Sequence, residues 1–272
     1  GVMGLADVFF RLRLAFDSPE ALALSTRIAE EIALAAYGES AALAAAHGPH
    51  PSYAQTRAAR GVLHPDHWPD ATPVHPGEWD ALRARIGEVG LRNSLLVAIA
   101  PTATIASIAG CFECIEPQVS NVFKRETLSG EFLQINTYLV ADLKERGLWT
   151  GRVRDAIKRA DGSVQGIGGL PADLRVLYRT VWELPQKALI DLAAARTPYV
   201  DQSQSLNLFM ASPTIGKLSS MYAYAWRSGL KTTYYLRSRP ATRIAQTTVT
   251  ATPAAEAVAC SLENPETCEA CQ

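Results

Sequence analysis

The chain of 272 residues carries 26 lysines and arginines against 27 aspartates and glutamates, a net charge of −1 at pH 7. This balance gives no overall field that would attract nucleic acid or an anionic membrane. No apolar run approaches the ~18 residues of a membrane span, and no signal peptide is recognisable. Because the first residue is not methionine, we expect a fragment or a processed product. The odd number of cysteines, five, favours a reducing and therefore cytoplasmic compartment.

The first predicted element is a long helix over residues 16–48, which is dominated by alanine and leucine. Ser18 can cap it, Pro19 suits its first turn, and Gly48 follows its end. Residues 48–78 are rich in proline and histidine, and this composition predicts an irregular surface segment.

Residues 92–100, RNSLLVAIA, form an apolar run of strand length, followed by a loop that enters a short helix. A second helix is predicted over residues 129–147, with Ser129 as its cap and Gly147 as its stop. Its apolar face consists of Phe132, Ile135, Leu139 and Leu143.

Residues 171–198 predict two helical pieces, because Pro185 should break the run. Residues 205–211 and 231–239 resemble strands, and residues 212–229 predict a helix that ends at Gly229. Strands alternating with helices favour an α/β fold with parallel strands. Residues 241–272 contain no aromatics and predict a flexible tail after a first domain of residues 1–240.

Two features can carry chemistry near the middle and the end of the chain. The loop Pro101-Thr102-Ala103-Thr104-Ile105-Ala106 runs into a helix start, where free N–H groups and the helix dipole attract phosphate. On spacing alone, an ordinary capped turn is the simpler explanation. The pair Cys268 and Cys271 is a dithiol able to close to a disulfide, or half of a four-ligand zinc site, to which Cys260 would add only a third ligand and which the pair Cys111 and Cys114 would complete. Thiol exchange suits a flexible arm better than a closed metal site.

The third feature is Tyr234 beside Tyr235, within LKTTYYLRSRP. In a regular strand the two rings point to opposite faces, so the simple interpretation places one ring in the core. A role in electron transfer requires stacked rings and therefore a local departure from the pleat.

The five histidines all lie in or beside residues 48–78, without the spacing of a metalloprotease helix. We interpret them as part of a solvated loop.

These features occur together in one family. The sequence resembles the C-terminal part of the large, catalytic subunit of class I ribonucleotide reductase. The resemblance runs along nearly the whole chain and is carried by GVMGLADVF (1–9), RNSLLVAIAPTATIASIAG (92–110), IEPQVSN (115–121), LSGEF (128–132), DLKERGLW (142–149), DQSQSLN (201–207), GKLSSMYAYAWRSGLKTTYYLRSRPA (216–241) and CSLENPETCEACQ (260–272).

The resemblance implies the C-terminal portion of a ten-stranded α/β barrel that reduces ribonucleoside diphosphates by radical chemistry. It implies that Pro101–Ala106 receives the substrate diphosphate, that Tyr234 and Tyr235 relay the radical, and that Cys268 and Cys271 re-reduce the active site. The implied partners are a metal-containing, radical-generating small subunit, thioredoxin or glutaredoxin, and the N-terminal portion of the large subunit. We expect no nucleic acid or membrane partner.

The resemblance also implies what the chain lacks. The family's radical-bearing cysteine, its reducible cysteine pair and its allosteric nucleotide sites lie N-terminal to this segment. We therefore expect the segment to bind no cofactor and to be inactive alone. Cys111 and Cys114 depart from the usual family pattern, and buried reduced thiols are the simplest explanation. The alternatives are a cobalamin-dependent reductase fragment, which needs no relay, and a non-catalytic thiol-redox or zinc-binding module.

Overall fold

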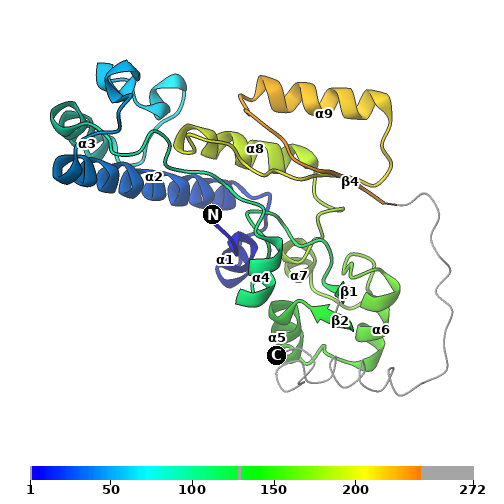
Figure 1. Ribbon diagram of the computed structural model, residues 1–272. Coiled ribbons are helices and arrows are strands. Elements are labelled where there is room, and N and C mark those ends of the chain that lie inside the picture. The colour runs from blue at the N-terminus through cyan, green and yellow to red at the C-terminus, as the bar shows by residue number, and fades with distance from the viewer. Residues whose placement is uncertain (1, 128–129, 240–272) are drawn as a thin grey trace. The chain divides into compact units, whose positions relative to one another are not determined.

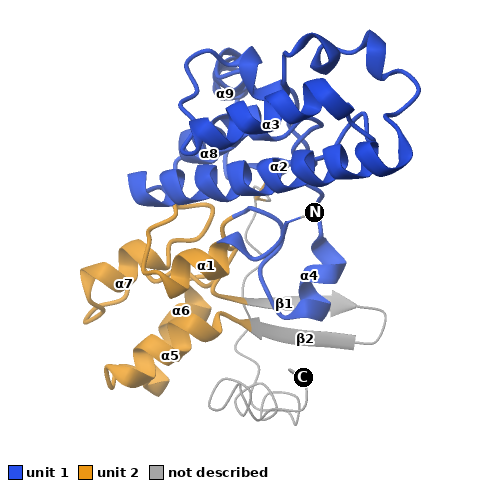
Figure 2. Ribbon diagram, turned by 90° about the vertical axis from the view of Figure 1, so that its left-hand side faces the viewer, with its two compact units in different colours: residues 1–5, 17–116, 185–237 blue, residues 6–16, 117–184, 238–272 orange. Residues whose placement is uncertain are grey.

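The computed structural model describes residues 2–127 and 130–239 of the chain (Figure 1). Within these residues the chain forms two compact units (Figure 2). Unit 1 comprises residues 1–5, 17–116 and 185–237, and unit 2 comprises residues 6–16, 117–184 and, in the described chain, 238–239. Both candidate sites that can be described belong to unit 1.

The long first helix is confirmed as α2, Pro19–His47. Ser18 accepts a hydrogen bond from Ala21 N through its side chain, and Pro19 occupies the first turn, where no intrahelical donor is needed. Gly48 follows with φ of 80°, and its N–H donates to Ala44 O. These three local signals are sufficient to set the ends of the helix.

Unit 1 is built on α2, which packs against α3 (Pro76–Val89) and α8 (Gln186–Arg196). Its other elements are the 3-10 turns η1 (Tyr53–Gln55), η2 (Ala58–Arg60), η3 (His64–His67) and η4 (Thr197–Tyr199), α4 (Ala103–Ala109), β3 (Leu208–Met210), α9 (Ile215–Arg227) and β4 (Leu236–Ser238). The core joins α2, α3 and η4 through Ala33, Tyr37, Leu63, Trp79, Ile86 and Tyr199.

The proline- and histidine-rich segment 48–78 is only partly the solvated excursion that its composition predicts. It is irregular, with three short 3-10 turns, but Leu63 lies in the core at 1% exposure. The buried Glu30 carboxylate of α2 accepts hydrogen bonds from Val74 N and His75 N, at 2.8 and 3.0 Å. Long-range partners therefore order a segment that has little regular secondary structure.

The strand predicted over residues 92–100 does not form as a strand. Its described pairing is one isolated parallel bridge between Ile99 and Gln204, with bonds from Ile99 N to Ser203 O and from Ser205 N to Ile99 O. The Asp201 carboxylate instead accepts from Leu96 N and Val97 N. A side chain thus satisfies backbone donors that a neighbouring strand would otherwise pair, and the parallel sheet is reduced to one bridge in the described chain.

The helix predicted from Ser129 begins too early. Two strands, β1 (Val122–Thr127) and β2 (Gly130–Ile135), pair antiparallel here, and the helix is only α5, Thr137–Glu145. Ser129 lies outside the described residues, and Asn136 is the actual cap, accepting from Tyr138 N and Leu139 N. Because Asn136 N also donates to Asn121 O, long-range pairing overrides the helical periodicity before residue 136.

Unit 2 centres on buried amide side chains. Its helices are α1 (Leu5–Arg11), α5, α6 (Gly151–Arg159) and α7 (Ala172–Leu177); the first residue of α1, Leu5, belongs to unit 1. Asn121 donates to Gly162 O and Tyr178 O, each at 2.9 Å, and accepts from Asn136 Nδ2 at 2.9 Å. Gly162 must be glycine here, because a Cβ would lie 1.9 Å from Ser120 Oγ at a φ of +83°.

The break at Pro185 and the helix ending before Gly229 are confirmed, as α7 and α8 are separate and α9 ends at Arg227. The strands predicted at residues 205–211 and 231–239 are confirmed only as three-residue strands, β3 and β4, which pair with each other. No helix among residues that the structure describes is long and apolar enough to cross a membrane.

Candidate radical-relay and substrate sites

The tyrosine pair lies directly before β4, in unit 1. The ring centroids of Tyr234 and Tyr235 are 4.0 Å apart with an interplanar angle of 49°, and Tyr234 OH donates to Tyr235 OH at 3.1 Å. Both side chains are about half exposed, at 47% and 53%. The hydrogen bond with Tyr235 raises the pKa of Tyr234, so this phenol stays protonated at neutral pH.

Backbone hydrogen bonds hold the pair against residues 206–208. Tyr234 N donates to Leu206 O at 2.7 Å, Tyr235 N donates to Asn207 Oδ1 at 3.1 Å, and Leu208 N donates to Tyr235 O at 2.9 Å. Residues 232–235 are not part of β4, so the backbone departs from the pleat here. The interpretation that one ring points into the core is wrong: both rings are about half exposed, and they lie in contact with each other at a tilt.

The loop Pro101–Ala106 forms the start of α4, as predicted. Thr102 is buried and has a φ of 36°, an unusual conformation for a β-branched residue. Its hydroxyl does not cap α4 but accepts from Cys114 N at 2.8 Å. Pro101, Ala103, Thr104 and Ile105 are exposed and Ala106 is buried. The first N–H groups of the helix therefore have no intrahelical or Thr102 acceptor.

Hydrogen bonds connect the neighbourhood of this loop with the tyrosine pair. Cys114 N is bound by Thr102, and two residues later Glu116 Oε1 accepts from Asn207 N at 3.1 Å. Asn207 Oδ1 in turn accepts from Tyr235 N. Within unit 1, the two candidate sites are thus linked by these three hydrogen bonds together with the backbone from Cys114 to Glu116.

Glu116 and Asn207 were not singled out as site residues, although both stand in motifs that carry the resemblance. Glu116 is 8% exposed, and burial raises the pKa of its carboxyl. Hydrogen bonds from Asn207 lower this pKa, but by less than burial raises it. The signal that the sequence offered was a polar residue within each motif. Their long-range pairing could not be read from the sequence.

The cysteines divide into described and undescribed groups. Cys114 is buried, and burial raises the pKa of its thiol to about 11, while Cys111 is only half-buried, and neither forms a disulfide within the described residues. Cys114 is therefore a poor thiolate nucleophile, in agreement with the prediction of a buried reduced cysteine. The tail cysteines Cys260, Cys268 and Cys271 lie outside the described residues, so the dithiol and the four-thiolate zinc alternative stay predictions. Among residues 2–127 and 130–239, no cluster of three or more potential metal ligands occurs.

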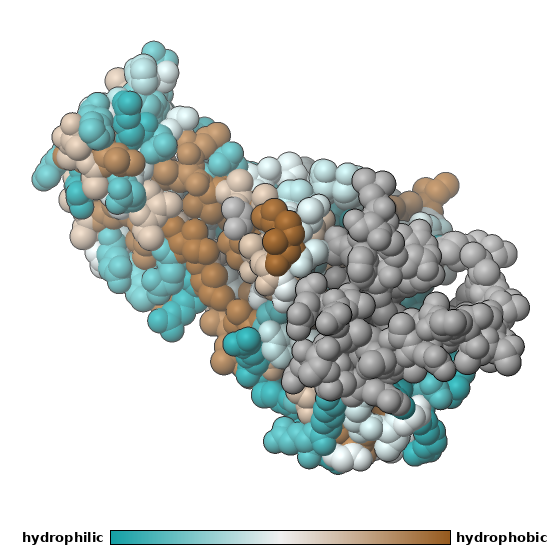
Figure 3. Space-filling model, turned by 60° about the horizontal axis from the view of Figure 1, so that its bottom comes forward, coloured by the Kyte–Doolittle hydropathy of each residue, from teal (hydrophilic) through white to brown (hydrophobic). Residues whose placement is uncertain are grey.

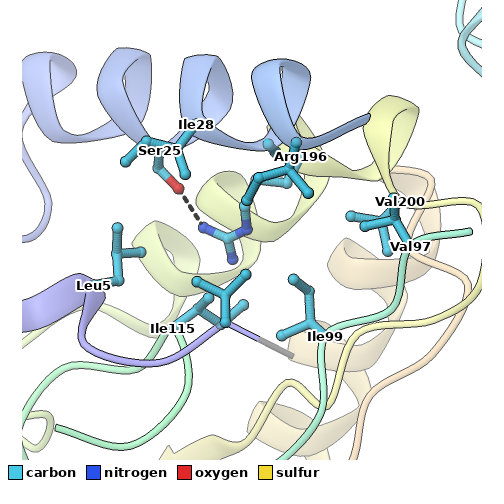
Figure 4. Close-up of a pocket in the computed structure, with 11 residues that line it drawn as sticks. Leu5, Ser25, Ile28, Val97, Ile99, Ile115, Arg196 and Val200 are labelled. Carbon is cyan, nitrogen blue, oxygen red and sulfur yellow. Dashed lines mark hydrogen bonds between the residues drawn. The ribbon is translucent and has the colours of Figure 1, made fainter. Parts of the chain in front are cut away.

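A small apolar pocket in unit 1 lies between α2, α8 and residues 97–99 (Figure 4). Arg196 reaches into it from α8, donating from Nη1 to Ser25 Oγ at 2.7 Å and from Nε to Gln204 Oε1 at 3.2 Å. The guanidinium is fully enclosed, and burial lowers its pKa to about 10. Its hydrogen bonds fix α8 to α2 and to the parallel bridge.

Apolar side chains also remain uncovered on the surface, where Figure 3 shows a brown apolar band on the face presented. In unit 1 the exposed members include Ile32, Leu95, Ile105, Ile108, Ile215, Tyr222 and Trp226. On α9, Ile215, Tyr222 and Trp226 recur at a spacing of seven and four residues, so they share one face of the helix. Such a stripe leaves apolar area exposed to water, which is unfavourable unless another surface covers it.

Comparisons with known proteins agree with these features. A family model described as "Ribonucleotide reductase, barrel domain" matches residues 1–236. The ribonucleoside-diphosphate reductase large subunits of Danio rerio and Arabidopsis thaliana are 44% and 42% identical along the whole chain, which covers 36% of each. The solved structure of the Actinobacillus ureae class Id ribonucleotide reductase alpha subunit matches 89% of this chain and 38% of its own, with a TM-score of 0.67 and 26% identity. The chain spans about a third of the length of these relatives. It therefore belongs to the ribonucleotide reductase barrel-domain family.

Proposed function

We propose that the chain supplies part of the catalytic subunit of a ribonucleoside-diphosphate reductase, and that Tyr234 and Tyr235 pass a radical toward the substrate. The observation that carries this is the pair of half-exposed phenols with ring centroids 4.0 Å apart and hydroxyls 3.1 Å apart. When one phenol oxygen gives its proton and electron to the phenoxyl beside it, the hole moves without any charged intermediate.

The substrate diphosphate is proposed to bind at Pro101–Ala106. Support comes from the exposed residues at the start of α4 and from the Thr102 hydroxyl, which is drawn away by Cys114 N and leaves the helix start uncapped. Backbone N–H groups at such a place are suited to phosphate oxygens. The hydrogen-bonded run through Glu116 and Asn207 gives the loop and the relay a shared framework.

The tail cysteines Cys268 and Cys271 are proposed as the dithiol that resets the active site. Replacing a 2′-hydroxyl by hydrogen consumes two electrons and two protons and releases water. Oxidation of one dithiol to a disulfide supplies both electrons and both protons. Thioredoxin or glutaredoxin, through its own dithiol, then returns the tail to the reduced state by exchange. In this proposal residues 241–272 form a mobile arm after a barrel part of residues 1–240.

Other polypeptides complete the enzyme in this proposal. The N-terminal portion of the large subunit supplies the remaining barrel strands, to a total of ten, the radical-bearing cysteine and the effector sites. The small subunit brings the radical and its metal. The exposed apolar side chains of unit 1, among them the stripe Ile215, Tyr222 and Trp226 on α9, support such contacts.

The test is production of deoxynucleotide after the chain is combined with an N-terminal portion and a small subunit. Tyr234→Phe and Tyr235→Phe should each abolish product while leaving the circular-dichroism spectrum unchanged, because phenylalanine cannot lose a hydroxyl proton. Tyr138→Phe, at a half-buried tyrosine of unit 2 whose hydroxyl accepts from Arg11 Nε, is the control and should retain activity. Full activity of both relay variants would refute the relay. Activity that depends on adenosylcobalamin instead of the small subunit would favour the cobalamin-dependent alternative.

A further inference from the structure

Lys231, three residues before Tyr234, has an unusual environment for a lysine. Lys231 Nζ lies 2.8 Å from Val200 O, 2.9 Å from Asp201 O and 2.9 Å from Gln202 O, and 2.7 Å from His64 Nε2. An ammonium has three protons to donate, so these four acceptors use its whole capacity. We name these acceptors the Lys231 seat. A lysine on an ordinary surface keeps its head group in water.

His64 can accept from Lys231 in only one protonation state. Its Nδ1 lies 2.8 Å from Pro198 O, and because a carbonyl only accepts, Nδ1 carries the proton. Nε2 of the neutral ring is then left with a lone pair that faces the ammonium. Burial lowers the pKa of His64, in agreement with this neutral form. The prediction of solvated histidines is therefore wrong for His64.

The segment 48–78 holds His64 in this position. Tyr37 on α2 is hydrogen-bonded to the backbone of His64, and the ring of Trp68 packs on the imidazole with centroids 4.7 Å apart. Lys231 Nζ is 5.7 Å from the centroid of the same indole. Gly229, which ends α9, adjoins Trp68 so closely that a Cβ would lie 3.1 Å from its Nε1. Segment 48–78 therefore contacts the chain at Gly229 and at Lys231, directly before the tyrosine pair.

The contact continues from Lys231 to the phenols. Lys231 binds residues 200–202, Thr232 Oγ1 donates to Gln204 O, and Tyr234 N donates to Leu206 O. Successive hydrogen bonds therefore join residues 231–234 to residues 200–206 along their length. The Lys231 seat is the first of these contacts. Because the two rings are half exposed, packing contributes little to their arrangement, and the backbone must set it.

We propose that Lys231 is a positioning residue for the tyrosine pair and that His64 is the part of its seat contributed by segment 48–78. The proposal rests on the proposed function, because positioning matters to catalysis only if the pair relays a radical. Lys231 touches neither substrate nor reacting atoms. It acts by fixing where the chain enters the paired-ring conformation.

Protonation of His64 should release the seat. It would remove the lone pair on Nε2 and set a second cation 2.7 Å from the ammonium. The charged and titratable groups that act on His64 are Lys231, Asp201 and His67, and the Tyr37 side chain is hydrogen-bonded to its backbone; Asp66 lies on the same 3-10 turn, η3. Asp66 is already bound by Arg83 and Leu63 N, and Asp201 by Leu96 N and Val97 N, so neither carboxylate is free to replace the lost contact. The seat should therefore open below the ordinary histidine pKa of about 6.5.

The experiment measures ring arrangement and turnover separately in the full chain. Tyrosine-selective 13C NMR, assigned with Tyr234→Phe and Tyr235→Phe, reports the ring-current shifts of the stacked pair. In Lys231→Met these shifts should fall toward free-tyrosine values, and kcat of the reconstituted enzyme should fall roughly tenfold or more at unchanged KM, since small misplacements are costly. Lys231→Arg should recover part of both. Lys217→Met, at an exposed lysine on α9, is the control and should change neither.

His64→Gln tests the pH dependence, because a glutamine carbonyl can accept from Lys231 without titrating. The wild-type ring shifts should weaken as pH falls below about 6.5, whereas those of His64→Gln should stay level. Unchanged ring shifts and kcat in Lys231→Met would overturn the proposal. If Lys231→Met disturbs the rings while both tyrosine variants remain fully active, the positioning stands and the relay itself fails.

Discussion

Polar side chains lie in opposite environments in two parts of the molecule: the buried amides Asn121 and Asn136 of unit 2, here called the amide hub, and the tyrosine pair of unit 1. Asn121 and Asn136 are almost fully buried, and each amide is bonded to several partners from distant parts of the chain. Tyr234 and Tyr235 are half exposed, and their hydroxyls bond to each other. Buried, fully bonded polar groups stabilise a fold, whereas accessible groups can react. The contrast separates residues that should matter for stability from those that should matter for chemistry.

The hub should give the largest loss of stability. Asn121→Ala removes the side-chain donor to Gly162 O and Tyr178 O and leaves Asn136 Nδ2 with Gln118 Oε1 alone, so we expect a loss of about 3 kcal/mol in the free energy of unfolding. Urea unfolding followed by circular dichroism measures it. The exposed neighbour Val119 supplies the control, because Val119→Ala should change stability by less than about 0.5 kcal/mol. Equal effects of the two variants would contradict the hub.

A second buried polar group is Glu30, at 0% exposure. Its carboxylate binds Trp79 Nε1 as well as two backbone N–H groups of the segment 48–78. Glu30→Gln turns one acceptor into a donor that faces a donor, and should cost about 2 kcal/mol. Limited proteolysis should then cut near Val74 before the rest of the chain. The adjacent exposed Glu31→Gln should leave both stability and cleavage nearly unchanged; early cleavage in it too would remove the special role of Glu30.

The cap of α2 should have a smaller effect. Ser18→Ala removes the acceptor for Ala21 N and should cost about 1 kcal/mol in urea unfolding. Thr26→Ala removes a hydroxyl from the middle of the same helix, where it bonds only Leu22 O. That control should be neutral or slightly stabilising, because alanine favours the helix interior. A larger loss in Thr26→Ala would reverse the assignment.

The tyrosine pair should have the smallest effect on stability. Tyr234→Phe keeps the ring and loses one exposed hydrogen bond, so the midpoint of thermal unfolding should move by no more than about 2 °C. Differential scanning calorimetry of the chain is sufficient to measure this. A large decrease would mean that the hydroxyl pair is structural, and the contrast with the hub would disappear.

Prediction from sequence was accurate where structure depends on neighbouring residues. The limits of α2, the break at Pro185 and the end of α9 before Gly229 follow from caps, prolines and glycines within one helical turn. Prediction was wrong where distant residues compete. The amide of Asn136 starts α5 seven residues later than the predicted cap Ser129, because β1 and β2 pair antiparallel before it.

The candidate site divides in the same way. The sequence by itself determined that two phenols are adjacent, that a loop with two threonines enters a helix, and that the chain belongs in this family. Only the tertiary structure decided that the phenols face each other, that Thr102 binds Cys114 N, and that His64 receives Lys231. The partners in the last two contacts are separated by 12 and 167 positions in the sequence. Which residues meet over such separations depends on how the intervening chain packs, and local sequence patterns do not specify it.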